Sequence, residues 1–229
     1  MAGEAKSKVF EFRGIDSVWY AKLKSDTEES IEYDTPKYLY PVAELGKETE
    51  ASSEPHYYDN KALISVSSEG ADTVTLTGAG IPIDVLADIT GKYFDPELGV
   101  MSENQGEAPY IALLYRTKGT DGYYRYVVRY KTKASIPSET SHTEDDSTDG
   151  NGQELTFTGI NTTHEFTKGG SAKALVIDTR YGNADLTDFF TKVQTIDTIQ
   201  AASAVETASA GKADSAGKAD STGGTEQQS

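Results

Sequence analysis

The sequence predicts a mainly β protein in which two packed antiparallel sheets form a sandwich or barrel beside one flanking helix. Short segments alternate apolar and polar residues with a period of two, Gly, Pro, Asn and Asp bound them, and few stretches carry helix signals. Apart from a polar C-terminal end, about 200 residues remain for a core, the usual size of one domain. The expected strands are Ser17–Leu23, Ala62–Ser67, Thr73–Thr77, Tyr110–Arg116, Tyr123–Lys131, Glu154–Ile160 and Ala174–Asp178.

The clearest strand runs from Tyr123 to Lys131, and the apolar segment Tyr110–Arg116 before it is its expected hairpin partner. Between them, Gly119-Thr120-Asp121-Gly122 tolerates the positive φ of a tight turn. By alternation, one face of the strand carries Tyr124, Tyr126, Val128 and Tyr130. The other face carries Tyr123, Arg125, Val127, Arg129 and Lys131.

Two helices are expected. The first spans Ile81–Thr90, with Pro82 at the first helical position and Gly91 as the C-terminal cap. A second, shorter helix is expected over Leu186–Val193, where Asp185 is a possible N-cap and apolar residues recur on one face. Two long polar stretches, Gly46–Asn60 and Pro137–Gln153, are expected to be loops.

The chain divides into three parts. Residues 1–13 form an expected N-terminal arm, residues 14–199 the β domain, and residues 200–229 a tail rich in Ala, Gly and Ser. The tail has no aromatic residue and repeats Ser-Ala-Gly-Lys-Ala-Asp twice, so burial could not offset the entropy lost on ordering. We expect the tail to be disordered.

Composition restricts the function. The chain has no cysteine, so it has neither disulfides nor thiolate metal sites. Its formal net charge of −16 opposes binding to a phosphate backbone. No segment approaches the roughly 18 apolar residues that span a membrane, and the N-terminus lacks the apolar run of a signal peptide. We expect a soluble protein, made in the cytoplasm, without membrane contact.

Motifs for chemistry are weak or missing. Asp145–Gly150 resembles the start of a calcium loop, but Thr156 stands where the bidentate Glu belongs. His56, His142 and His164 are too scattered for a zinc motif, and neither a Gly-x-Ser-x-Gly elbow nor a phosphate-binding Gly-rich loop follows a strand. We expect no enzyme activity, no metal and no cofactor.

Several stretches resemble the major tail protein, or tail tube protein, of long-tailed non-contractile bacteriophages (siphophages) of Gram-positive hosts. The similarity extends over about residues 14–199, and no single motif in it is specific. The stretches that carry it are Gly14–Ala21, Tyr33–Val42, the aromatic-Asp-Asn turn Tyr57–Asn60, Ala87–Tyr93, Ala108–Ala112, Asp121-Gly122 and Ile136-Pro137.

The resemblance implies a structural virion subunit. Such subunits self-assemble into stacked rings, expected to be hexameric, that form a hollow conduit for DNA ejection. The implied partners are other copies of the chain, a tape measure protein inside the tube, and tail terminator and distal tail proteins at its ends. DNA is expected to pass without specific binding. The alternative from the residues alone is a β-sandwich that binds carbohydrate or acts as an adhesin, because exposed tyrosines suit sugar recognition.

In cyclic rings the contacts are head-to-tail, so one surface of the subunit must complement a different surface of the next copy. The candidate subunit-contact face carries Arg125, Arg129 and Lys131, and a solvated strand face explains these residues equally well. Its expected counterparts are acidic loops that contact a neighbour or line the lumen. These loops carry Glu48, Glu50, Glu54, Glu144, Asp145, Asp146 and Asp149.

Overall fold

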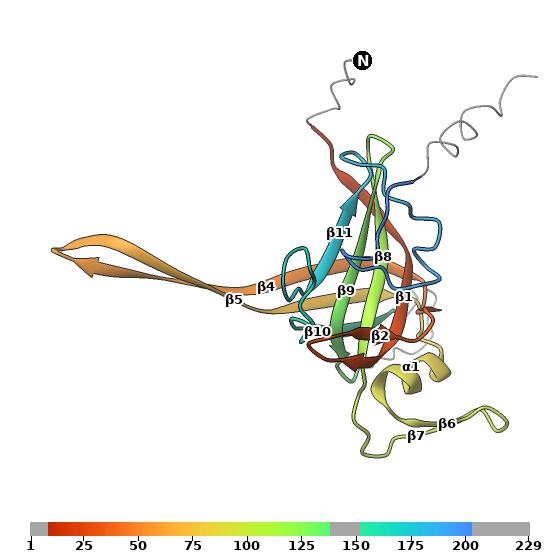
Figure 1. The fold of residues 1–229 in the computed structure, drawn as a ribbon. Coiled ribbons are helices and arrows are strands. Elements are labelled where there is room, and N and C mark those ends of the chain that lie inside the picture. The colour runs from red at the N-terminus through yellow and green to blue at the C-terminus, as the bar shows by residue number, and fades with distance from the viewer. Residues whose placement is uncertain (1–8, 138–151, 203–229) are drawn as a thin grey trace, which may run out of the picture.

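The computed structural model describes residues 9–137 and 152–202. Within them the protein is mainly β, with one flanking helix, as predicted. Nine strands form a curled antiparallel sheet with the order β2-β1-β8-β9-β10-β5-β4, in which β3 also pairs with β1 and β11 with β9, while β6 and β7 form a separate hairpin (Figure 1). The elements are β1 (Phe12–Asp26), β2 (Ile31–Tyr33), β3 (Lys37–Tyr38), β4 (Val42–Tyr58), β5 (Lys61–Gly78), α1 (Ile83–Thr90), β6 (Tyr93–Asp95), β7 (Val100–Ser102), β8 (Tyr110–Gly119), β9 (Tyr124–Ala134), β10 (Gln153–Gly159) and β11 (Ala174–Asp178).

All seven expected strands are present. The predicted hairpin is β8–β9, and Gly122 has φ 84° in its turn. The segments 62–67 and 73–77 belong to one long strand, β5. Strand β1 begins at Phe12, and a bridge joins Ala184 to Ala201.

The main core lies inside the curl of the sheet. Strand β8 is buried on both faces, and Ile111, Leu113 and Tyr115 point into this core while Ala112 and Leu114 point away from it. The antiparallel sheet therefore carries apolar residues on both sides at its centre. The core also includes Val18, Tyr20, Leu39, Tyr40, Val74, Leu76, Ile89, Val127, Leu155 and Phe157.

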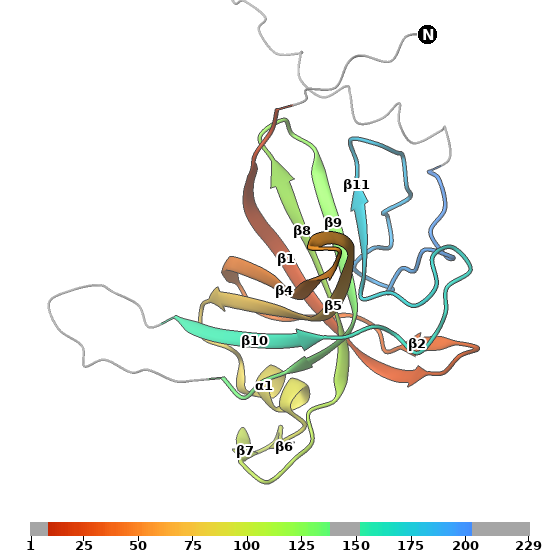
Figure 2. The same cartoon turned by 90° about the vertical axis from the view of Figure 1, so that its left-hand side faces the viewer.

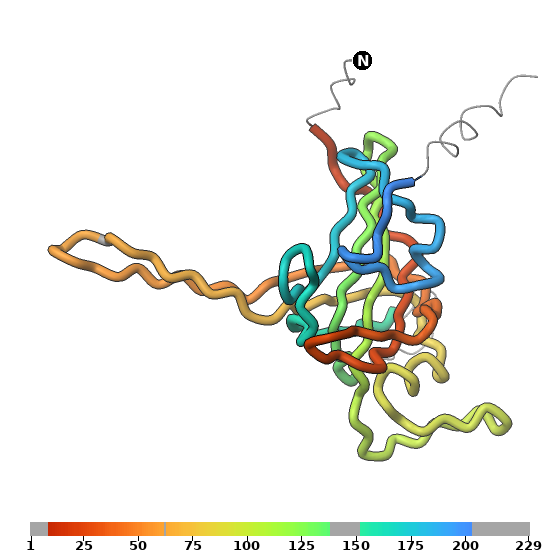
Figure 3. The backbone as a smooth tube through the Cα atoms, in the orientation of Figure 1, coloured from red at the N-terminus to blue at the C-terminus, as the bar shows by residue number. Residues whose placement is uncertain are grey.

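The C-terminal segment after β11 covers the outer face of β1, β8 and β9 (Figure 3). The predicted helix over Leu186–Val193 is wrong, because this segment forms turns. Tertiary packing explains the difference: Phe189 packs on Tyr126 with ring centres 4.9 Å apart, and Phe190 packs on Trp19 at 5.8 Å. Helix propensity is a weak preference, and tertiary packing of this kind can override it.

Helix α1 closes one end of the core. Gly91 ends it with φ 71° and donates its N–H to the carbonyl of Ala87, as the sequence predicts. A Cβ on Gly91 would lie 2.1 Å from the carbonyl oxygen of Glu107, so only glycine fits there. Asp88 ties the helix to the sheet: its carboxylate accepts a bond of 2.8 Å from the Tyr20 hydroxyl and pairs with Lys22 at 2.5 Å.

A buried carboxylate joins the sheet to the long β4–β5 hairpin. Asp72 of β5 is 3% exposed and pairs with the Arg129 guanidinium at 2.7 Å and the Lys173 ammonium at 3.1 Å. Thr49 of β4 donates its hydroxyl to the same carboxylate at 2.9 Å. One side chain thus connects both strands of the hairpin with β9 and the β10–β11 connection.

Asp72→Asn is expected to lower the free energy of unfolding by about 3 kcal/mol, because it leaves the buried Arg129 without a counter-charge. Urea denaturation of dilute protein would measure this. The matched control is Asp34→Asn, which removes an exposed pair with Lys24 and should cost less than about 1 kcal/mol. Equal losses in the two variants would contradict the role assigned to Asp72.

The difference in unfolding free energy between wild type and Asp72→Asn is expected to depend on pH. Burial alone would raise the pKa of Asp72, but hydrogen bonds from Thr49 and Lys173 and the charges of Lys47 and Lys173 hold it below its usual value. A carboxyl group with a lowered pKa stabilises the fold above its unfolded pKa of about 3.9, and that contribution disappears as the pH falls through the folded pKa. The difference between wild type and Asp72→Asn should therefore shrink below about pH 4.

Candidate functional site

A projecting two-stranded ribbon is the most prominent feature of the surface. Strand β5 pairs with β10 only from Asp72 to Gly78, so residues 50–71, which we call the arm, extend beyond the sheet. Among the described residues, the two strands of the arm pair only with each other. The nine extended residues from Glu50 to Tyr58, together with the turn beyond them, give the arm a reach of about 30 Å. Figure 1 shows the arm leaving one side of the body, and in Figure 2 it points toward the viewer.

The turn at the tip of the arm sets the pairing of its two strands. Asp59 and Asn60 have φ of 50° and 60°, the backbone of a tight two-residue hairpin turn, and Asp and Asn tolerate positive φ better than most residues. Directly opposite pairs follow on both sides, beginning with Tyr58 and Lys61. At the base, Lys173 bonds the Glu69 carboxylate at 2.6 Å and the Gly70 carbonyl at 2.8 Å, which fixes where the arm leaves the body.

Large apolar side chains are exposed near the tip of the arm. Tyr57 is 67% and Leu63 65% exposed, and Tyr58, Ile64 and Val66 are also more than half exposed. The rest of the arm is polar and acidic, with Glu50, Glu54, Asp59 and Glu69 against a single lysine, Lys61. An apolar cluster on a projecting element, rimmed by charge, is typical of a protein-binding surface.

The arm corrects the prediction of a polar loop over Gly46–Asn60. Glu48, Glu50 and Glu54 lie on strand β4, where Glu48 pairs with Thr73 and Glu54 with Val66. Because both faces of the ribbon are exposed beyond Thr49, this part of β4 has no buried side and hence no apolar alternation for sequence analysis to detect. In the sequence, only the Asp59-Asn60 turn and the expected strand after it indicate a hairpin here.

The predicted basic face of β9 is not a single face. Leu113 pairs with Arg129 but Ile111 pairs with Thr132, so β9 carries one extra residue in a β-bulge. The bulge reverses the alternation, and Lys131 lies on the opposite side of the sheet from Arg129.

Each of the three cations is bound within its own subunit. Arg125 pairs with Asp178 at 3.2 Å, Arg129 with the buried Asp72, and Lys131 with Asp26 at 2.5 Å. Reversing the charge of Arg129 would therefore disturb folding before it disturbed any contact with a neighbour. The candidate residues Glu144, Asp145, Asp146 and Asp149, together with His142, lie outside the described residues.

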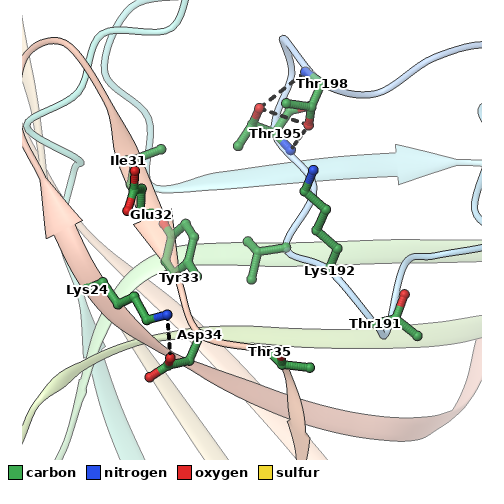
Figure 4. Close-up of a pocket in the computed structure, with 11 residues that line it drawn as sticks. Lys24, Ile31, Glu32, Tyr33, Asp34, Thr35, Thr191, Lys192, Thr195 and Thr198 are labelled. Atoms are coloured by element: carbon green, nitrogen blue, oxygen red, sulfur yellow. Dashed lines mark hydrogen bonds and ion pairs between the residues drawn. The ribbon is translucent and has the colours of Figure 1, made fainter.

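Conventional ligand sites have little support in the part of the chain that the structure describes. There, no group of three or more His, Cys, Asp or Glu side chains could hold a metal ion, and no helix is long and apolar enough to cross a membrane. One surface hollow lies between β2 and the C-terminal segment (Figure 4). Several polar groups in it are already bonded to each other: Lys24 pairs with Asp34 at 2.8 Å, and Thr195 bonds Thr198 at 3.1 Å. No protein-family model matches the chain, and a search of curated proteins finds no match.

The arm is expected to be dispensable for folding of the body, because none of the side chains between 50 and 71 that the structure describes belongs to either core cluster. Replacing residues 50–71 by Asn-Gly would join the paired residues Thr49 and Asp72 through a two-residue turn. The free energy of unfolding, measured in urea, should stay within about 1 kcal/mol of that of the wild type. An unfolded variant would show instead that the arm stabilises the body.

Proposed function

We propose that the chain is a structural subunit of a siphophage tail tube, which self-assembles into stacked, hexameric rings around a conduit for DNA. The observation that carries this proposal is the arm, whose exposed apolar tip has no partner element within the described part of the subunit. The resemblance of residues 14–199 to major tail proteins supplies the kind of assembly. In this account the protein belongs to the virion and has no catalytic role.

The shape of the subunit supports a head-to-tail assembly. The arm leaves the body on one side (Figure 1), and in the proposed assembly it contacts a different surface of the next copy. Such heterologous contacts generate closed rings or open filaments rather than dimers with two-fold symmetry. A stack of rings is closed within each ring and open along the tube axis. A tape measure protein inside the tube and terminator and distal tail proteins at its ends remain proposals of the resemblance.

The charge of the chain is consistent with a conduit. Six copies with a formal charge of −16 each give a ring of −96. DNA carries one phosphate for about every 1.7 Å of its axis, so an acidic wall repels it, whereas a basic wall would hold it by releasing counterions. The proposed tube lets DNA pass without retaining it.

Changing the tip of the arm is expected to abolish assembly without unfolding the subunit. The variant Tyr57→Ser, Ile64→Ser, Val66→Ser changes three exposed side chains, so the free energy of unfolding should change little. The apolar area that the arm would bury against the next copy is largely removed. Electron microscopy and sedimentation velocity of the purified chain would show rings or tubes for the wild type and monomers for the variant.

The matched control is Tyr181→Ser, which removes an exposed aromatic side chain far from the arm in sequence and should leave assembly intact. Unchanged assembly of the triple variant would reject the arm as the assembly element. A wild-type chain that stays monomeric at high concentration and binds a glycan saturably would favour the carbohydrate-binding or adhesin alternative, for which the exposed tyrosines at the tip are the supporting observation.

The assembled protein is expected to have no measurable affinity for double-stranded DNA at moderate salt, because its net charge repels phosphate. Fluorescence anisotropy with a labelled duplex would measure this. Binding that weakens steeply with added salt would indicate a basic surface that faces DNA, contrary to a passive acidic conduit.

A further inference from the structure

A groove at the α1 end of the body has the chemistry to receive an arm. This groove, which we call the α1 groove, lies between α1, β3 and the β6–β7 hairpin, and its lining includes Tyr38, Val85, Tyr93, Phe94 and Pro96. Tyr38 is 46% and Tyr93 64% exposed. Aromatic side chains of this kind provide large contact area at a low entropic cost, as in protein interfaces.

The lining of the α1 groove carries a small excess of positive charge in an acidic protein. Lys22, Lys37 and Lys92 line it, against Asp84 and Asp88, whereas the whole chain carries −16. Lys22 and Lys37 both bind Asp88, at 2.5 and 3.1 Å, and Lys92 pairs with Glu103 at 3.7 Å. The side chain of Lys37 is 63% exposed, so its ammonium group retains donors for a second carboxylate.

The arm and the α1 groove complement each other in apolar surface and in charge. The arm presents apolar and aromatic side chains beside Glu54 and Asp59, and the groove presents aromatic side chains beside lysines. The arm points away from the body and the groove lies by α1 at the lower end in Figure 1, so an arm cannot bind its own groove. An arm that binds this groove must therefore come from another copy.

We propose that the arm of one copy binds in the α1 groove of a second copy. The proposal rests on the proposed function and specifies its contact: tip residues Tyr57 and Ile64 pack against Tyr38 and Tyr93, and an acidic residue of the arm pairs with Lys37. The two surfaces differ, so each copy offers one arm and one groove, and the contact propagates from copy to copy.

The absence of cysteine allows a direct test by disulfide crosslinking. Ile64→Cys places a thiol on the arm and Tyr93→Cys places one in the α1 groove, both at exposed positions that should tolerate the change. The two single-cysteine chains, one of them enlarged by a tag, are mixed under assembly conditions and oxidised. The control pairs Ile64→Cys with Tyr181→Cys, an exposed position on the segment after β11.

The expected result is a heterodimer of arm and groove chains, formed several-fold more than the control heterodimer and lost when Lys37→Glu is added to the groove chain. Assembly of both chains without preferential crosslinking would overturn the proposed contact and leave the tube function standing. No assembly of the wild type under any condition would overturn the proposed function itself. A control pair that crosslinks as well as the arm–groove pair would also overturn the contact.

Discussion

A two-stranded β-ribbon in water buries too little surface to be stable by itself. In this protein the ribbon formed by residues 50–71 extends about 30 Å beyond its sheet and carries exposed apolar side chains at its tip. Both properties are unfavourable for an isolated subunit, since the ribbon gains little from ordering and its tip invites association. Both become favourable once another protein surface covers the arm.

The body of the protein is organised to hold the arm at its base. Asp72 connects both strands of the hairpin to Arg129 and Lys173, and Lys173 extends the contact to Glu69 and Gly70. Burial makes these ion pairs difficult to break one at a time, because any partner that is removed leaves an unpaired charge. The base is thereby fixed while the tip is exposed, and the arm leaves the body in a defined orientation.

The central strands were predictable from the sequence because each packs apolar side chains against a core. Strands β8 and β9 alternate or are apolar throughout, and the turn between them contains Gly122 at positive φ. Helix α1 was predictable from its cap, Gly91. Local signals failed where a distant part of the chain decides the structure, as at Phe189 and Phe190, which pack on Tyr126 and Trp19 from turns rather than from a helix.

The candidate site was only partly predictable, for a physical reason. A strand exposed on both faces has the composition of a loop, so β4 carried its acidic residues without an apolar pattern. The bulge that separates Arg129 from Lys131 depends on pairing with Ile111 and Leu113, which the sequence of β9 alone does not specify. Likewise, the α1 groove collects residues from β1, β3, α1 and β6 that are far apart in the chain.

Amide hydrogen exchange at low and at high protein concentration tests the central claim most directly, because it follows the arm itself. We expect the arm amides to exchange rapidly in the dilute subunit and to become protected when copies associate, while β8 and β9 stay protected in both conditions. An arm that is already as protected as β8 in the monomer, or that stays unprotected in the assembled state, would contradict the account.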